Sequence, residues 1–372
     1  MTPTRFHPVT RSPGILRGWQ GIAVACAAVL LPVRGEDILL GGSSELASAA
    51  DVFLADSDLN VRWRNPKREF TLLLGVGQIN LDYLPPKINI LGVPDERNET
   101  RESCQFTWRE GLDQRLQWNL SCGAYHGFTD YRSVWLDEYY RQLFGTVAGY
   151  ETADVGGINA SIGGRYEYLE ASGLVSWSVG WQQDAVSPAY EKIIFGPLVR
   201  GVDTLTTWRF GLGSEHVLTS RLRFKQDAAL ILSTDRDTRY AYSAETAWAI
   251  TDAWTARLRA EGVKEAEFHS ISGGLLVEHD WEGKWFAGMA VRAYRDDGQI
   301  LDPLLISGSA PPLDSLLVQV TLRYSGPNAT WRFAIGPYLT RYAELTPGTA
   351  RFAPLYRNRD WLAVQGAWSW HF

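Results

Sequence analysis

The segment DWLAVQGAWSWHF, residues 360–372, carries a large apolar side chain at almost every second position. Successive side chains of an extended strand point to opposite sides. One side therefore carries the large residues Leu362, Val364, Trp368, Trp370 and Phe372. The other side carries small or polar residues such as Gln365 and Ser369. The segment predicts a β-strand with one apolar face and one polar face.

The same alternation runs back through the chain to about residue 69. Segment 316–324 shows it most clearly, because the aliphatic side chains Leu316, Val318, Val320 and Leu322 alternate with polar ones. A strand between lipid and water requires this period of two. A β-sandwich in water also alternates, but residues 218–225 place arginine and lysine on the polar side. A water-filled lumen accepts these charges, whereas a dry core does not.

The repeated pattern predicts an all-β protein, a transmembrane antiparallel up-and-down β-barrel of about 14 strands, with 12 or 16 as alternatives. The composition agrees, since 16 Trp and 16 Tyr accompany only 2 Met. Tight turns alternate with mostly long loops, as short periplasmic turns and long outer loops do in such barrels. The predicted strands are 69–80, 102–110, 114–126, 156–168, 174–184, 203–213, 217–233, 238–250, 254–263, 268–279, 284–295, 314–324, 329–342 and 360–372.

The chain is predicted to have three parts. Residues 1–35 read as a signal peptide, with a basic start, an apolar run over 18–33 and small residues at Val33 and Gly35 before a cleavage point. Residues 36–68 lack strong periodicity and are predicted to be a periplasmic lead-in, and 69–372 form the barrel. Residues 1–35 contain four Arg and no acidic residue, so their removal changes the formal charge from −6 to −10. This acidic balance argues against nucleic acid as a partner.

The alternating aromatic residues that lead to Phe372 resemble the terminal signature of bacterial outer-membrane β-barrel proteins of the porin-like kind. The resemblance implies that Trp368, Trp370 and Phe372 are an assembly signal read by the barrel-assembly machinery. It also implies a place in the outer membrane of a Gram-negative-type bacterium, in contact with its lipid and lipopolysaccharide. Aromatic residues gather at the same strand ends, as expected of a girdle at headgroup level.

Strand parity predicts more basic than acidic side chains in the lumen. The basic lining is predicted to comprise Arg165, Arg209, Arg221, Arg223, Lys225, Arg257, Arg259, Arg292, Arg323 and Arg332. A pore lined by one sign of charge favours the opposite ion. We therefore expect a channel that passes small hydrophilic, anionic solutes by diffusion. Two alternatives stay open: the charges pair within the wall, or the barrel has a structural or surface-interaction role without transport.

Two further segments bear on function. Residues 133–145 have helical spacing inside the long loop 127–155, so this loop either folds into the lumen or caps its rim. His269 lies near Ser270 and Ser272 in the sequence, but no spacing requires a catalytic dyad. The sequence therefore predicts no catalytic residue, no metal ligand and no cofactor.

Cys104 and Cys122 are predicted to form a disulfide. If the hairpin is centred on Asp113, these two residues face each other and both lie on the lipid side. Directly opposed positions on antiparallel strands are within disulfide range. The outer membrane borders an oxidising compartment, where such bonds persist.

Overall fold

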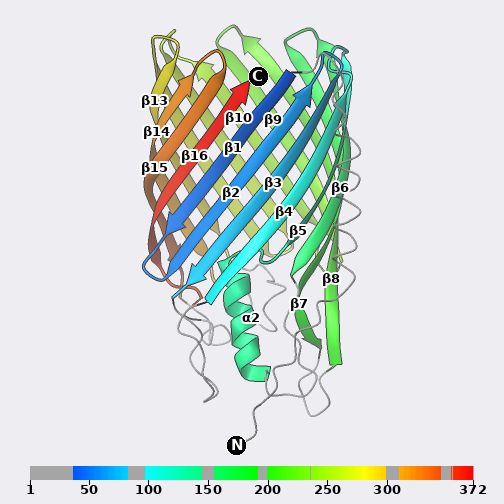
Figure 1. The fold of residues 1–372 in the computed structure, drawn as a ribbon, viewed down its shortest axis with the longest axis vertical. Helices are drawn as coiled ribbons and strands as arrows, with labels where there is room; N and C mark the ends of the chain where they lie inside the picture. The colour runs from blue at the N-terminus through cyan, green and yellow to red at the C-terminus, as the bar shows by residue number, and fades with distance from the viewer. Residues whose placement is uncertain are drawn as a thin grey trace, which may run out of the picture. The chain divides into compact units, whose positions relative to one another are not determined.

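In a computed structural model of the protein, sixteen antiparallel strands form one closed barrel in which each strand pairs with its neighbours in sequence and β1 pairs with β16 (Figure 1). The structure describes residues 37–82, 97–144, 155–191, 199–234, 236–298, 310–344, 353 and 355–371. The predicted signal peptide and Phe372 lie outside these residues. Among the described residues, no helix is long and apolar enough to cross a membrane.

The strands have the following bounds: β1 Asp37–Ser48, β2 Val52–Arg64, β3 Arg68–Leu81, β4 Arg97–Glu110, β5 Leu116–His126, β6 Gly156–Leu169, β7 Gly173–Glu191, β8 Val199–Thr219, β9 Leu222–Ser233, β10 Arg239–Ala249, β11 Trp254–Glu265, β12 Phe268–Trp281, β13 Trp285–Asp296, β14 Leu313–Ser325, β15 Ala329–Tyr342 and β16 Arg359–His371. The helix α2 spans Tyr131–Phe144.

The prediction for residues 36–68 is wrong, because β1 and β2 lie in this segment and close the barrel. The barrel therefore has 16 strands, the larger of the alternatives, and begins at Asp37. In β1 both faces mix aliphatic residues with glycine and serine, so the sequence carries only a weak period of two. Pairing with β2 and β16 on either side makes it a strand nonetheless.

The predicted faces are confirmed along the barrel. In β14, Val320 is 61% exposed on the outer side, whereas the inward Gln319 and Thr321 are buried in the wall. Outward aromatic residues near the tight turns are exposed, as a girdle requires. These residues are Tyr166, Tyr168, Trp248, Trp254, Trp285, Trp331 and Trp370.

The two ends of the barrel differ in the connections between strands. The turn end holds the short connections, such as 65–67 and 326–328, together with the start of β1 and the end of β16. The loop end holds the long connections and α2 (Figure 1). Since barrels of this type have short periplasmic turns and longer outer loops, the turn end is the periplasmic side.

The predicted register of the hairpin β4–β5 is wrong by two residues. Cys104 lies opposite Ala124, and Cys122 lies opposite Phe106. The two cysteines share the outward face, but they are diagonal neighbours on the ladder. Diagonal positions are about 7–8 Å apart, beyond the usual span of a disulfide. The direct cross-strand opposition on which the predicted bond depends is therefore absent.

Candidate functional site: the barrel lumen and its two ends

The inward faces of β6 to β15 carry most of the predicted basic residues. Four of them are exposed within the closed barrel and have no ion pair among the described residues. These four are Arg165, Arg209, Arg292 and Arg332. Charged side chains that stay exposed on the inner side of a closed wall show a lumen open to water along this part of the barrel.

The other predicted lumen cations are paired with carboxylates. The pairs within the wall are Arg223–Glu215, Lys225–Asp227, Arg257–Glu245, Arg259–Glu261 and Arg323–Glu278. Arg221 lies at the edge of the wall, in the turn between β8 and β9, and pairs with Asp252. Pairing within the wall, one of the two alternatives, therefore holds for five of the ten predicted lumen cations and not for the four exposed arginines.

Strands β1 and β2, in the segment predicted to be a periplasmic lead-in, bring acidic residues into the lumen. Glu45, Asp56 and Asp58 face inward on β1 and β2, where they line a recess together with Arg332. The predicted excess of basic over acidic lining is therefore smaller than the sequence indicated. Residues 59–63, Leu-Asn-Val-Arg-Trp, carry the alternation that reveals β2 and the inward direction of Asp58.

An apolar cluster closes part of the loop end. Inward side chains at the strand ends, including Ile79, Leu81 and Trp361, pack against α2. From the helix, Trp135 and Leu136 enter this cluster and are almost fully buried. The described part of loop 127–155 thus packs on the rim and closes part of the mouth at the loop end, which agrees with the rim-cap alternative.

The start of α2 is fixed by reciprocal hydrogen bonds. The backbone N–H of Ser133 donates to the Asp130 carboxylate at 3.0 Å, and the Ser133 hydroxyl accepts from the backbone N–H of Asp130 at 3.3 Å. Asp130 is therefore the N-cap of the helix, and Ser133 occupies the third helical position of a capping box.

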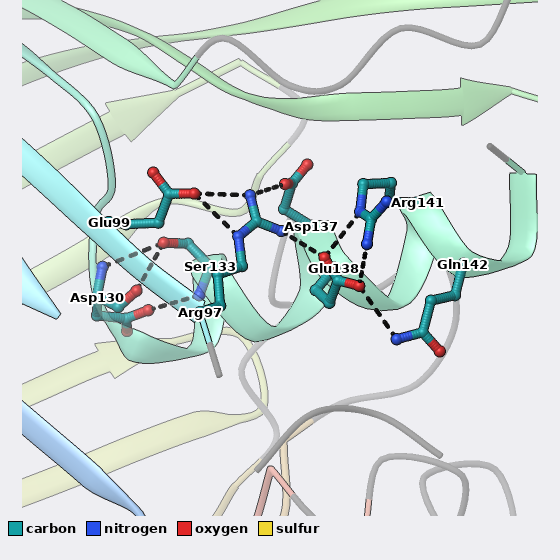
Figure 2. A network of polar contacts seen from close by, with 8 residues as sticks. All are labelled: Arg97, Glu99, Asp130, Ser133, Asp137, Glu138, Arg141 and Gln142. Atoms are coloured by element: carbon teal, nitrogen blue, oxygen red, sulfur yellow. Dashed lines mark hydrogen bonds and ion pairs between the residues drawn. The ribbon is translucent and has the colours of Figure 1, made fainter. Parts of the chain in front are cut away.

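A charged network ties α2 to the wall (Figure 2). Arg97, at the loop end of β4, lies 2.6 Å from Asp137 Oδ2 and 3.0 Å from Glu138 Oε2. Glu138, whose side chain is 2% exposed, also accepts hydrogen bonds from Arg141 and Gln142. Burial alone raises the pKa of Glu138, but these hydrogen bonds and the nearby arginine charges outweigh it and lower the pKa.

Arg359 forms a second anchor at the same mouth. Its Nε lies 3.0 Å from Asp51 Oδ1 in the turn between β1 and β2. The guanidinium also lies over the rings of Tyr131 in α2 and Trp361 in β16. The helix, the first hairpin and the last strand are therefore held together at one point.

The histidine considered for catalysis does not meet its serine neighbours. His269 faces outward and contacts Asp297 through Nδ1 at 3.1 Å. Ser272 faces inward and donates to Glu261 at 2.9 Å. Strand parity thus places the two residues on opposite sides of the wall. Among the described residues, no group of three His, Cys, Asp or Glu side chains is arranged to hold a metal ion.

No protein-family model and no curated protein matches the chain. Among solved structures it is similar to CdiB from Acinetobacter baumannii, with a TM-score of 0.52 and 10% identity over 90% of this chain. The chain spans 60% of the length of that protein. It is also similar to a TodX monoaromatic hydrocarbon channel mutant (TM-score 0.47, 8% identity, 91% of each chain). A third similar structure is OccD3 of Pseudomonas aeruginosa (TM-score 0.45, 10% identity, 91% of this chain and 92% of that one).

At such low identity these similarities concern the fold. The closed 16-stranded barrel, its apolar outer face and its aromatic girdle define the class of fold, and the similarity to CdiB agrees with it. It has the fold of a transmembrane β-barrel of the bacterial outer-membrane kind.

Proposed function

We propose that the protein is a passive channel for small hydrophilic solutes that favours anions. The exposed arginines Arg165, Arg209, Arg292 and Arg332 carry this proposal, since they line the inside of a closed barrel without ion pairs among the described residues. Barrels of 16 to 18 strands are wide enough to leave an aqueous channel. His269 and Ser272 lie on opposite sides of the wall and do not contact each other.

The strength of this anion preference depends on two parts of the barrel wall, β6 to β15 and β1 to β2. The unpaired arginines attract anions to the wall formed by β6 to β15. Glu45, Asp56 and Asp58 on β1 and β2 offer an acidic lining to cations. We therefore propose a moderate anion preference and not strict exclusion of cations.

Reconstitution into planar bilayers tests the proposal. Under a gradient of potassium chloride, we expect discrete openings and a reversal potential that shows anion preference. Replacing Arg165, Arg209, Arg292 and Arg332 together by Gln should move the reversal potential towards cations. Arg295→Gln is the matched control, because Arg295 faces outward at the loop end and pairs with Asp314. Cation preference in the unchanged protein contradicts the proposal.

A structural or surface-interaction barrel without transport is the second candidate. The packing at the loop end favours it, since Leu81, Trp135 and Leu355 are all 0% exposed there. The same bilayer measurement separates the two functions. The second candidate is supported if the wild-type protein shows no openings in the bilayer and a variant with a loosened apolar cluster at the loop end shows none either.

A further inference from the structure

A recess of about 400 Å³ lies in the inner wall near the turn end. We call it the arginine recess. Its charged lining residues are Arg221, Arg223, Arg257, Arg323 and Glu278. Its less polar lining includes Val217, Ala247 and Leu276. The lining of the recess thus has four guanidinium groups and one carboxylate, that of Glu278.

Strand register explains why the recess is hollow. Ala247 on β10 lies directly opposite Arg223 on β9 and Arg257 on β11. Since neighbouring strands are about 4.8 Å apart, the two arginine backbones are roughly 10 Å apart. The small alanine between them leaves room for a bound group that both long side chains can reach.

Two of the four guanidinium groups have hydrogen-bond donors to spare. Arg257 Nε lies 3.6 Å from Glu245 Oε1, and Arg323 Nε lies 3.6 Å from Glu278 Oε1. These are ion pairs, but the distances are too long for hydrogen bonds. Among the described residues, neither side chain donates a hydrogen bond, although each guanidinium has five N–H donors.

The remaining contacts orient this lining. The Arg323 guanidinium lies over the ring of Phe286, 3.7 Å from its centroid, and is thereby held against the wall. Arg223 and Arg221 each have a carboxylate partner, Glu215 and Asp252. They therefore add positive charge around the recess, while Arg257 and Arg323 supply the available donors.

We infer that the arginine recess binds a small organic carboxylate on its way through the lumen. A guanidinium matches a carboxylate with two parallel hydrogen bonds, and Arg257 and Arg323 have such donors available. The apolar side chains of Val217, Ala247 and Leu276 suit a short hydrocarbon part, and a volume of about 400 Å³ holds a molecule of this size. The inference deepens the proposed function, on which it rests, by naming the solute class.

Calorimetric titration of the folded barrel in detergent tests the site without relying on transport. We expect succinate to bind and its neutral analogue succinamide to bind at least tenfold more weakly. Inorganic phosphate, which lacks a hydrocarbon part, should also bind more weakly than succinate. Equal binding of succinate and succinamide overturns the role of charge, and equal binding of phosphate overturns the role of the apolar lining.

Single substitutions locate the binding. Arg257→Gln and Arg323→Gln should each weaken succinate binding at least tenfold, and Ala247→Leu should weaken it by filling the space. Arg295→Gln should leave it unchanged within twofold, because Arg295 lies outside the recess. Altered migration of unheated protein on a denaturing gel identifies any variant that fails to fold. Wild-type affinity in folded Arg257→Gln and Arg323→Gln overturns the site.

Bilayer recordings then separate this inference from the proposed function. Succinate added to an open channel should interrupt the chloride current, and Arg257→Gln should raise the half-blocking concentration at least tenfold. If succinate binds in the calorimeter but the barrel never opens in the bilayer, the binding site is supported and the channel function is rejected. Openings without succinate binding or block keep the channel and reject the site.

Discussion

The two ends of the barrel use the inward face of the same strands in opposite ways. At the loop end, inward side chains such as Ile79, Leu81 and Trp361 are buried against α2. At the turn end, the inward side chains of Arg223 and Arg257 are 58% and 54% exposed. Polar alternation along a strand therefore shows which side faces inward, but it does not show whether that side is wet.

The charges differ between the ends as well. At the loop end Arg97 contacts three carboxylates, those of Glu99, Asp137 and Glu138, at hydrogen-bonding distances. At the turn end Arg257 and Arg323 lie 3.6 Å from their partners and keep donors available. Arginine holds a helix in place at one end and can recognise a solute at the other.

The largest expected effect comes from opening the loop end. Trp135→Ala removes a fully buried side chain, and such deletions cost about 3–5 kcal/mol. We expect faster hydrogen exchange of the α2 amides and a higher single-channel conductance, with unchanged succinate block at the turn end. Trp118→Ala is the control, since Trp118 is 44% exposed on the outer face. An equal effect of both changes argues against a closing role for the cluster.

The next effect tests the wall between the two ends. Val320→Arg places a charge on the lipid face near mid-height, which should cost about 2–4 kcal/mol of the free energy of unfolding into detergent or lipid. Ser43→Arg is the control, because Ser43 is exposed on the inward face beside Asp58. Urea titration in lipid vesicles measures both. Similar losses of unfolding free energy in both variants would contradict the assignment of the outward and inward faces.

The faces, the class of fold and most strands could be predicted because they depend on a local period of two. Val320 and Gln319 lie on the expected sides. Burial could not be predicted in the same way. Gln319 faces inward as expected, yet it is only 4% exposed. The arginine recess likewise depends on Ala247 meeting Arg223 and Arg257 across two strand pairs, which a single strand does not reveal.

The register of the hairpin β4–β5 could not be predicted from the sequence for a related reason. A shift of one residue moves every side chain to the other face, but a shift of two leaves the faces unchanged. The prediction for Cys104 and Cys122 was therefore correct in face and wrong in partner. Strands β1 and β2 were not predicted, because β1 has glycine and serine on both faces and therefore lacks a clear period of two. Their acidic lining residues were not predicted for the same reason.

A smaller effect concerns pH at the loop end. The pKa of Glu138 is lowered in the folded protein, so its contribution to the docking of α2 is complete above its unfolded pKa of about 4.3 and is lost as the pH falls through the lowered value. Conductance and gating noise should stay constant between about pH 8 and pH 5 and change below that range. Glu138→Gln removes the titrating group and should flatten this dependence. A change centred near pH 7 contradicts the assignment to Glu138.

The smallest expected effect is at the outward face of β4 and β5, away from both mouths. Because Cys104 is opposite Ala124 and Cys122 is opposite Phe106, we now expect two thiols that alkylate after denaturation without prior reduction. Mass spectrometry of the non-reduced protein measures this directly. Cys104→Ser and Cys122→Ser should each leave conductance and succinate block unchanged, since neither residue lies in the arginine recess or the apolar cluster at the loop end. A mass lower by two hydrogens, with no alkylation, would show that the disulfide forms. The pairing of β4 and β5 would then have to shift by two residues, a shift that leaves the faces of both strands unchanged.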